Sequence, residues 1–206
     1  GPDAIPDTNP FRVGSHLVEP SYFGYATAAN LHGLLAQTPR TYFVVTTSRK
    51  TVRVLEPAEF RLVWVPSRKF FGAARMEKYG ASISVSNLEK TLLDCLDRQD
   101  LAGGMPAVVQ VVHSAKPRIA YGRLRKYVVR MDNKSLAQRL GFLLERVRPE
   151  VPVPRSFLRF LRARTGVAFV ALGSPGLYGN RGRHRNDWRI VVNVPDVQLL
   201  GEVDVR

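Results

Sequence analysis

Residues 86–97 read Ser86-Asn-Leu-Glu-Lys-Thr-Leu-Leu-Asp-Cys-Leu-Asp97, and the hydrophobic pattern of the chain changes at this point. Before it, short apolar runs rich in β-branched and aromatic residues predict strands. After it, apolar residues recur every three or four positions, which predicts helices. Ser86 and Glu89 have the spacing of a capping box, in which each side chain accepts a hydrogen bond from the amide of the other residue. The helix that follows is expected to bury one apolar face, made of Leu88, Leu92, Cys95 and Leu96.

The part of the chain before this stretch is expected to be mainly strands. The runs with strand composition lie at residues 41–47, 52–55 and 60–65 and within 81–85, and a short helix is expected at 25–35. Residues 1–20 contain Pro and Asp without any period, so they are interpreted as an arm or linker.

The part after it is expected to be helical and to end in a strand. One helix is expected to start near Pro106, two more at residues 119–130 and 135–146, with Ser135 as the cap of the last, and a short basic one at 155–164. A Gly-rich loop at 173–186 and a strand at 188–194 close the chain. Strands first and helices later predict an α+β fold, with a mostly antiparallel sheet followed by a helical bundle and a final strand. The predicted division is an arm (1–20), an α+β subdomain (21–104) and a basic helical subdomain with the C-terminal strand (105–206).

The charge of the chain is concentrated in one region. The 206 residues hold 31 Lys and Arg against 17 Asp and Glu, a formal net charge of +14. Residues 116–189 alone hold 18 of the basic residues and four of the acidic ones, which accounts for the whole excess. A local excess of this kind favours a polyanionic partner, above all nucleic acid. The alternative is a basic surface that is only solvated.

Two places within this region have patterns that suit nucleic-acid binding. Arg155, Arg159 and Arg162 recur at helical spacing opposite an apolar face, which also describes an ordinary amphipathic helix with a solvated side. In the Gly-rich loop, arginines alternate with small residues between Tyr178 and Trp188, so they can follow a phosphate backbone while the aromatic rings stack on bases. The alternative there is a mobile surface loop. The candidate nucleic-acid-binding residues are Arg123, Lys126, Arg155, Arg159, Arg162, Arg181, Arg183 and Arg185.

No pattern for catalysis or metal binding stands out, so we expect a binding protein without enzyme activity, cofactor or metal. The four histidines are far apart, the Gly-Ser segments are not nucleophile elbows, and no phosphate-binding loop motif occurs. Glu89, Asp94 and Asp97 share one helix, where capping and a solvated face explain them. The single cysteine, Cys95, fits a reducing cytoplasm, and no apolar run approaches the roughly 20 residues that cross a bilayer. We therefore expect a cytoplasmic protein with no membrane partner.

The middle of the chain resembles the AbiE-type (AbiEi) antitoxins, which are transcriptional regulators of type IV toxin–antitoxin systems. The strongest match is the segment from Ser86 to Gly104, Ser-Asn-Leu-Glu-Lys-Thr-Leu-Leu-Asp-Cys-Leu-Asp-Arg-Gln-Asp-Leu-Ala-Gly-Gly. Weaker matches lie on both sides of this segment, at residues 25–34, 65–72, 139–145 and 188–193, and occur in the same order as in the family. Together they cover roughly residues 22 to 200.

The resemblance implies an antitoxin domain that counters a cognate nucleotidyltransferase toxin, binds double-stranded operator DNA and represses its own operon. Family members usually begin with a winged helix-turn-helix that reads the operator. About 20 residues precede the matching region here, so we expect sequence reading to belong to the full-length protein and the basic region to support it. The alternative from the residues alone is a stand-alone nucleic-acid-binding or nuclease-type protein.

Overall fold

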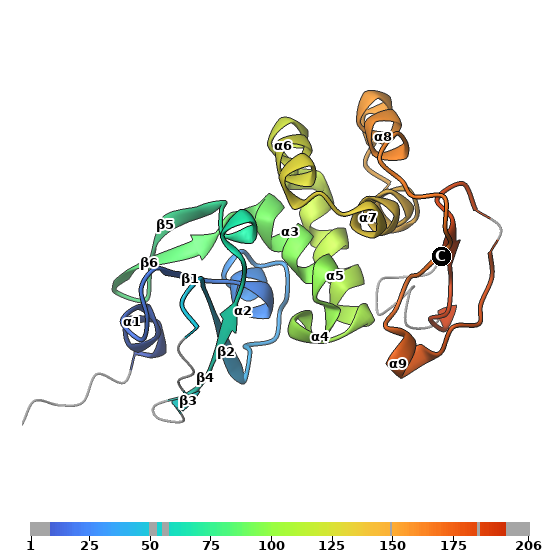
Figure 1. Ribbon diagram of the computed structural model, residues 1–206. Helices are drawn as coiled ribbons and strands as arrows, with labels where there is room; N and C mark the ends of the chain where they lie inside the picture. The colour runs from blue at the N-terminus through green and yellow to red at the C-terminus, as the bar shows by residue number, and fades with distance from the viewer. Residues whose placement is uncertain (1–8, 50–52, 55–57, 149, 185, 197–206) are drawn as a thin grey trace, which may run out of the picture.

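The main sheet of the computed structural model is mixed and has helices on both of its faces (Figure 1). The structure describes residues 9–49, 53–54, 58–148, 150–184 and 186–196. The strands of this sheet are β1 (Ser21–Phe23), β2 (Thr41–Thr46), β3 (Arg53–Val54), β4 (Glu59–Trp64), β5 (Ala73–Lys78) and β6 (Ala81–Ser86). Their order in the sheet is β3-β4-β2-β1-β6-β5. The prediction of an α+β fold is confirmed.

The prediction of a mostly antiparallel sheet is confirmed only in part, because three of the five described strand pairs are antiparallel and two are parallel. β1 and β2, β3 and β4, and β5 and β6 pair antiparallel, whereas β2 pairs with β4 and β1 with β6 in parallel. The first strand lies in the middle of the sheet, and β6 returns beside it in the same direction. Amino-acid composition does not predict whether two strands pair in parallel or antiparallel, because a buried strand has the same apolar residues in either case.

Several of the observed elements were not predicted from the sequence, among them β1, strand β5 and a helix near the N-terminus. Strand β5 forms an edge and exposes most of its side chains, so it lacks the apolar alternation of its neighbours; charged residues such as Lys78 suit an edge strand. Part of the predicted arm is the helix α1 (Pro10–Ser15), which Asn9 caps by accepting a hydrogen bond from the amide of Phe11. The ring of Phe11 is buried against the sheet. The interpretation of residues 9–20 as an aperiodic arm was therefore wrong.

One further helix lies between β1 and β2, and the remaining helices follow the last strand of the sheet along the chain. They are α2 (Tyr25–Leu31), α3 (Leu88–Asp97), α4 (Gln99–Ala102), α5 (Met105–Ala115), α6 (Tyr121–Met131), α7 (Lys134–Arg146), α8 (Arg155–Arg162) and α9 (Pro175–Tyr178). Two short 3₁₀ turns lie at Ser67–Lys69 and Lys116–Arg118. The C-terminal strand is shorter than predicted: β8 (Ile190–Val191) pairs in parallel with β7 (Val170–Ala171), which was not predicted.

Two helix caps differ from the prediction by one or two residues. Asn87, not Ser86, caps α3, because its side-chain oxygen accepts from the amide of Lys90 at 3.1 Å. Asn133, not Ser135, caps α7 in the same way. Asn is as good an N-cap residue as Ser, and each helix start contains one of each within two positions. Only the backbone conformation decides which of the two is the cap.

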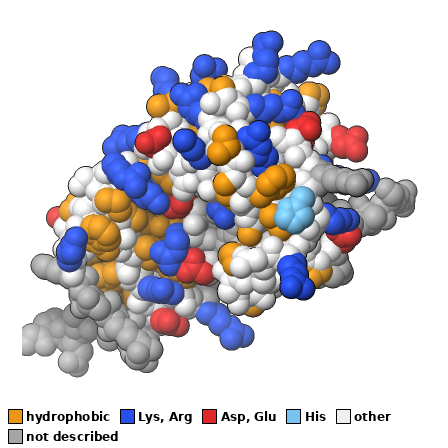
Figure 2. All heavy atoms as spheres, turned by 45° about the vertical axis from the view of Figure 1, so that its right-hand side comes forward, with side chains coloured by type: hydrophobic (Ala, Val, Ile, Leu, Met, Phe, Trp, Pro, Cys, Tyr) orange, Lys and Arg blue, Asp and Glu red, His pale blue; other side chains and the backbone are white. Residues whose placement is uncertain are grey.

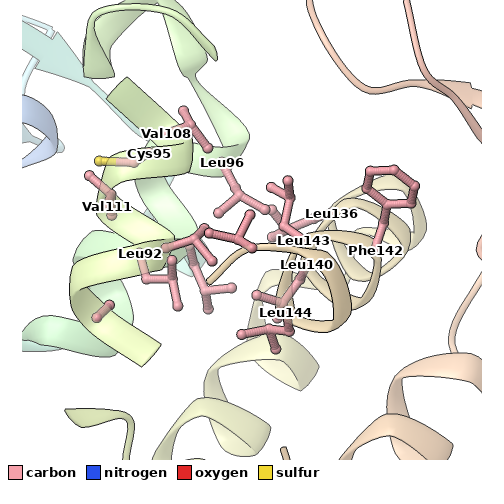
Figure 3. Close-up of a cluster of buried hydrophobic side chains, with 14 of the residues drawn as sticks. Leu92, Cys95, Leu96, Val108, Val111, Leu136, Leu140, Phe142, Leu143 and Leu144 are labelled. Carbon is pink, nitrogen blue, oxygen red and sulfur yellow. The ribbon is translucent and has the colours of Figure 1, made fainter. Parts of the chain in front are cut away.

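Helix α3 lies at the centre of the largest hydrophobic core. Leu92 and Leu96 of α3 and Val108 of α5 face Leu140 and Leu143 of α7 (Figure 3). This core continues without interruption from α2 to the C-terminal strands, so it crosses the boundary predicted after Gly104. The division into two subdomains there stays a prediction. The core fixes α6, α7 and α8 on the side of the molecule away from the sheet (Figure 1).

Candidate nucleic-acid interface

Helix α6 exposes four cations and contains no acidic residue. Leu124, Val128 and Met131 recur at spacings of four and three residues and are buried, which leaves the basic side chains in solvent. The exposed ones are Arg123, Arg125, Lys126 and Arg130.

The start of α6 is held by a buried acidic residue of α3. Glu89, whose exposed fraction is only 2%, accepts a hydrogen bond from the amide of Ala120 at 2.8 Å and pairs with Arg123 at 3.2 Å. A carboxylate at a helix N-terminus is stabilised by the unpaired amides and the helix dipole. Glu89 therefore compensates part of the charge of Arg123, whereas Lys126 of the same helix forms none of the described ion pairs.

Helix α8 presents a second basic face beside α6. Phe157, Phe160 and Leu161 are buried, while Arg155 and Arg159 are exposed. Within the part of the chain that the structure describes, neither of these arginines forms an ion pair.

The two helices meet at the ring of Phe160. The guanidinium of Arg125, from α6, lies 4.3 Å from the centre of this ring, and that of Arg164, just after α8, lies 4.2 Å from it. A second contact joins Tyr121 and Phe157, whose ring centres are 5.1 Å apart. Cation–π attraction holds the two like-charged groups near one ring, and neither has a carboxylate partner among the described residues.

The resulting surface is called the helix patch here, and all of its members are exposed and outside the described ion pairs. It consists of Arg125, Lys126, Arg155, Arg159 and Arg164. Lys and Arg side chains dominate the upper edge of the molecule in Figure 2, at the height of α6 and α8 in Figure 1.

Arg162 is placed differently from the other predicted arginines of α8. Its guanidinium pairs with Glu145 at 3.0 Å, lies 3.7 Å from Asp187, and sits over the Trp188 ring at 5.1 Å from the ring centre. The indole nitrogen of Trp188 donates to the same Glu145 at 2.7 Å. Arg162 thus joins α8, α7 and the C-terminal strand, and its charge is compensated within the protein.

The predicted basic loop lies at a separate end of the molecule and is well anchored. Arg181 is exposed, Arg183 pairs with Asp196, and Arg185 lies outside the described residues. Gly182 has no room for a side chain, because a Cβ atom there would be 2.2 Å from the carbonyl oxygen of Val192. Backbone hydrogen bonds in both directions join Arg183 and Val192. The loop is therefore held along its length and not only at its two ends. Trp188 is fully buried, so the prediction that its ring stacks on bases was wrong.

Of the acidic residues of α3, Glu89 and Asp94 are buried and Asp97 is partly buried, so the expectation of a solvated acidic face was wrong. Asp94 pairs with Lys90 in the interior, where Lys90 is only 1% exposed, and Asp97 pairs with Lys69 at 2.5 Å. Burial raises the pKa of Asp94 to about 6, against the attraction of Lys90. The described residues contain no group of three or more His, Cys, Asp or Glu that is suited to hold a metal ion.

Sequence reasoning missed Arg125 and Arg164, which complete the helix patch. Both were included in the charge count, but neither belongs to a regular spacing that singles it out. Their common feature is contact with Phe160, which is 35 residues from Arg125 in the chain.

A comparison with protein-family models gives no match for this chain, and a comparison with curated proteins finds no similar sequence. Among the described helices, none combines the length and the apolar character that crossing a membrane requires.

Proposed function

We propose that this chain is the antitoxin domain of a type IV toxin–antitoxin system, which grips the phosphate backbone of double-stranded DNA through the helix patch. One observation carries the binding part: Arg125 and Arg164 gather at the ring of Phe160 without a carboxylate partner among the described residues. Each of these guanidinium groups keeps a charge that no described carboxylate compensates, and a phosphate oxygen beside it can accept charge-assisted hydrogen bonds.

The arrangement suits backbone contacts better than base reading. The helix patch spreads over two helices joined through Phe160 and Tyr121, and contacts to phosphates fix the position of a protein on DNA without reading sequence. In this proposal the full-length protein reads its operator with a separate element, and the helix patch adds affinity. The proposal implies a protein that works in the cytoplasm.

The antitoxin part rests on the sequence resemblance of residues 86–104 to AbiE-type antitoxins. The proposal predicts that a gene next to this one encodes a nucleotidyltransferase. The test is co-expression with that enzyme: cells that make the enzyme alone are expected to stop growing, and this chain is expected to restore growth. Growth arrest that persists with soluble antitoxin present contradicts the antitoxin role. Metal-dependent cleavage of DNA or RNA by the purified chain supports the nuclease alternative instead.

The binding part is tested by fluorescence anisotropy with a labelled DNA duplex at several salt concentrations. Affinity is expected to fall steeply with salt, because binding releases counterions from the phosphates. Changing Arg155 and Arg159 together to Ala is expected to weaken binding and to reduce the slope of log K against log salt by about 2.

The matched control is Arg75→Ala. It removes an exposed cation on the edge strand β5, which lies on the opposite side of the molecule from α8 (Figure 1). It is expected to leave both affinity and slope unchanged. Equal losses of binding free energy per charge removed, for the control and for the α8 variant, show that only the net charge matters and contradict a site at the helix patch.

A further inference from the structure

Phe169, at the C-terminal end of the molecule, exposes an aromatic ring that the fold does not use. Its exposed fraction is 51%, and its ring contact among the described residues is the edge of His184, with ring centres 5.4 Å apart at an angle of 73°. Val167, two residues earlier, is 88% exposed. An exposed aromatic residue next to a basic loop is a common means of contacting nucleic-acid bases.

The backbone on both sides of Phe169 is fixed. The side chain of Gln138, which is 1% exposed, donates to the carbonyl of Ala168 at 3.1 Å. On the other side, the amide of Val170 donates to the carbonyl of Arg189 at 3.0 Å, within the β7–β8 pair. A ligand that stacks on the ring therefore does not have to order the segment that carries it, which favours binding.

The two segments beside Phe169 in the fold, the basic loop that carries His184 and the strand pair that carries Arg189, expose more positive than negative charge. Arg181 is exposed, and Arg189 is exposed while donating to the carbonyl of Gly166 at 3.0 Å. The nearby described acids, Asp187 and Asp196, each lie close to an arginine of their own, Arg162 and Arg183 respectively. Phosphates that approach Phe169 therefore meet a net attraction.

We propose that Phe169 is a stacking site for an unpaired base, with His184 beside it and with Arg181 and Arg189 on the neighbouring segments, so that this end of the protein binds single-stranded nucleic acid. This inference rests on the proposed function, because the helix patch supplies the shared affinity for phosphates. A duplex covers the faces of its bases by stacking them on each other, so a protruding ring reaches a base face only in a single strand, a loop or an end.

The experiment measures the affinity of wild-type protein and of Phe169→Leu for a single-stranded oligonucleotide and for the matching duplex. Leu keeps an apolar side chain of similar reach and loses the aromatic face. Phe169→Leu is expected to weaken single-strand binding roughly 5- to 150-fold, the range for one stacked base, without changing the salt slope. Duplex affinity is expected to stay unchanged.

Two further variants identify the cause. Phe169→Trp keeps an aromatic face and is expected to retain single-strand binding, whereas Val167→Ala removes exposed apolar area beside the ring and is expected to have no effect. A single strand of abasic sites offers phosphates without bases, and Phe169→Leu is expected to bind it as well as the wild type does.

The outcomes separate this inference from the proposed function. If the protein binds the duplex and Phe169→Leu binds the single strand as tightly as the wild type does, the stacking site is contradicted and the helix patch is not. Equal losses on duplex, single strand and abasic strand also overturn it, because stacking is then not involved. Wild-type protein that binds neither oligonucleotide overturns the proposed function itself.

Discussion

The indole ring of Trp188 lies against the backbone of Gly141, so closely that a Cβ atom on this glycine would be 2.2 Å from the ring. Trp188 is fully buried, and its contact with Gly141 and Glu145 seats the C-terminal strand pair on α7. The basic loop and Phe169 therefore have fixed positions relative to α8. The strand pair can pack this closely on α7 because Gly141 has no side chain and leaves space for the Trp188 ring.

Gly141→Ala is the first expected test of this contact. Glycine normally costs a helix about 0.5–1 kcal/mol relative to alanine, so a substitution without a clash increases stability. Here the added methyl group displaces Trp188, and we expect the free energy of unfolding in urea to fall by about 1–3 kcal/mol. Gly122→Ala is the control, because nothing lies within 4 Å of a Cβ atom there; it is expected to leave stability unchanged or increase it by up to about 1 kcal/mol. Equal effects of the two substitutions contradict the contact.

Arg162→Ala is expected to affect stability more than DNA binding. The substitution removes the ion pair with Glu145 and the cation–π contact with Trp188, which together are worth about 1 kcal/mol at a partly exposed site. Arg159→Ala, on the same helix, removes an unpaired cation and is expected to lower DNA affinity without destabilising the fold. Chemical denaturation and anisotropy distinguish the two. The reverse pattern places Arg162 in the DNA interface and contradicts its structural role.

The buried Asp94 is expected to make stability depend on pH. Its pKa in the fold is about 6 against an ordinary value of 3.8, because burial disfavours the charged form. Between about pH 4 and pH 6 the folded state holds a proton on Asp94 that the unfolded state has released, so this contribution to stability is lost as the pH rises through about 6. It amounts to at most about 3 kcal/mol.

The measurement compares unfolding free energies of wild type and Asp94→Asn across this pH range. Other groups titrate in both proteins, so the difference between them isolates Asp94. We expect wild-type stability to decline relative to the variant as the pH rises toward 6. A difference that does not change with pH shows that Asp94 is ionised in the fold throughout the range.

Lys90→Met tests the buried ion pair from the other side. Met fills the space beside Phe71, whose ring centre is 4.7 Å from the Lys90 ammonium, but it leaves Asp94 without its cation. Breaking a buried pair in this way costs about 3–5 kcal/mol near neutral pH. The double variant with Asp94→Leu is expected to regain most of the loss, because no buried charge remains. Urea denaturation of the three proteins gives the result, and a double variant no more stable than Lys90→Met contradicts this account.

Much of the fold follows from local patterns. The apolar face of α3, the β-branched composition of β2 and the alternation of buried and charged positions in α8 each identified an element near its observed bounds. Strand β5 and helix α1 escaped detection because one exposes most of its side chains and the other is too short to show a period. The direction of strand pairing escaped because it depends on how the chain returns, not on composition.

The candidate interface was predictable only in outline. The charge count identified the region, and the spacing identified Arg155 and Arg159. It did not distinguish Arg162, whose charge is compensated, from its neighbours on the same helix. Arg125 and Arg164 needed the contact with Phe160, and Phe169 needed the β7–β8 pair, which consists of two residues in each strand and leaves almost no sequence signal.

The sequence by itself determined the change from strands to helices near Ser86, the α+β class and the concentration of excess charge in residues 116–189. These properties depend on short-range periodicity and on counting, which any stretch of chain carries within itself. The tertiary structure decided which cations are compensated and which remain available, because an ion pair needs two groups that the core brings together. Glu145 meets Arg162 because α7 and α8 pack on each other, and Trp188, packed on Gly141, donates to the same carboxylate; no spacing in the sequence encodes these contacts.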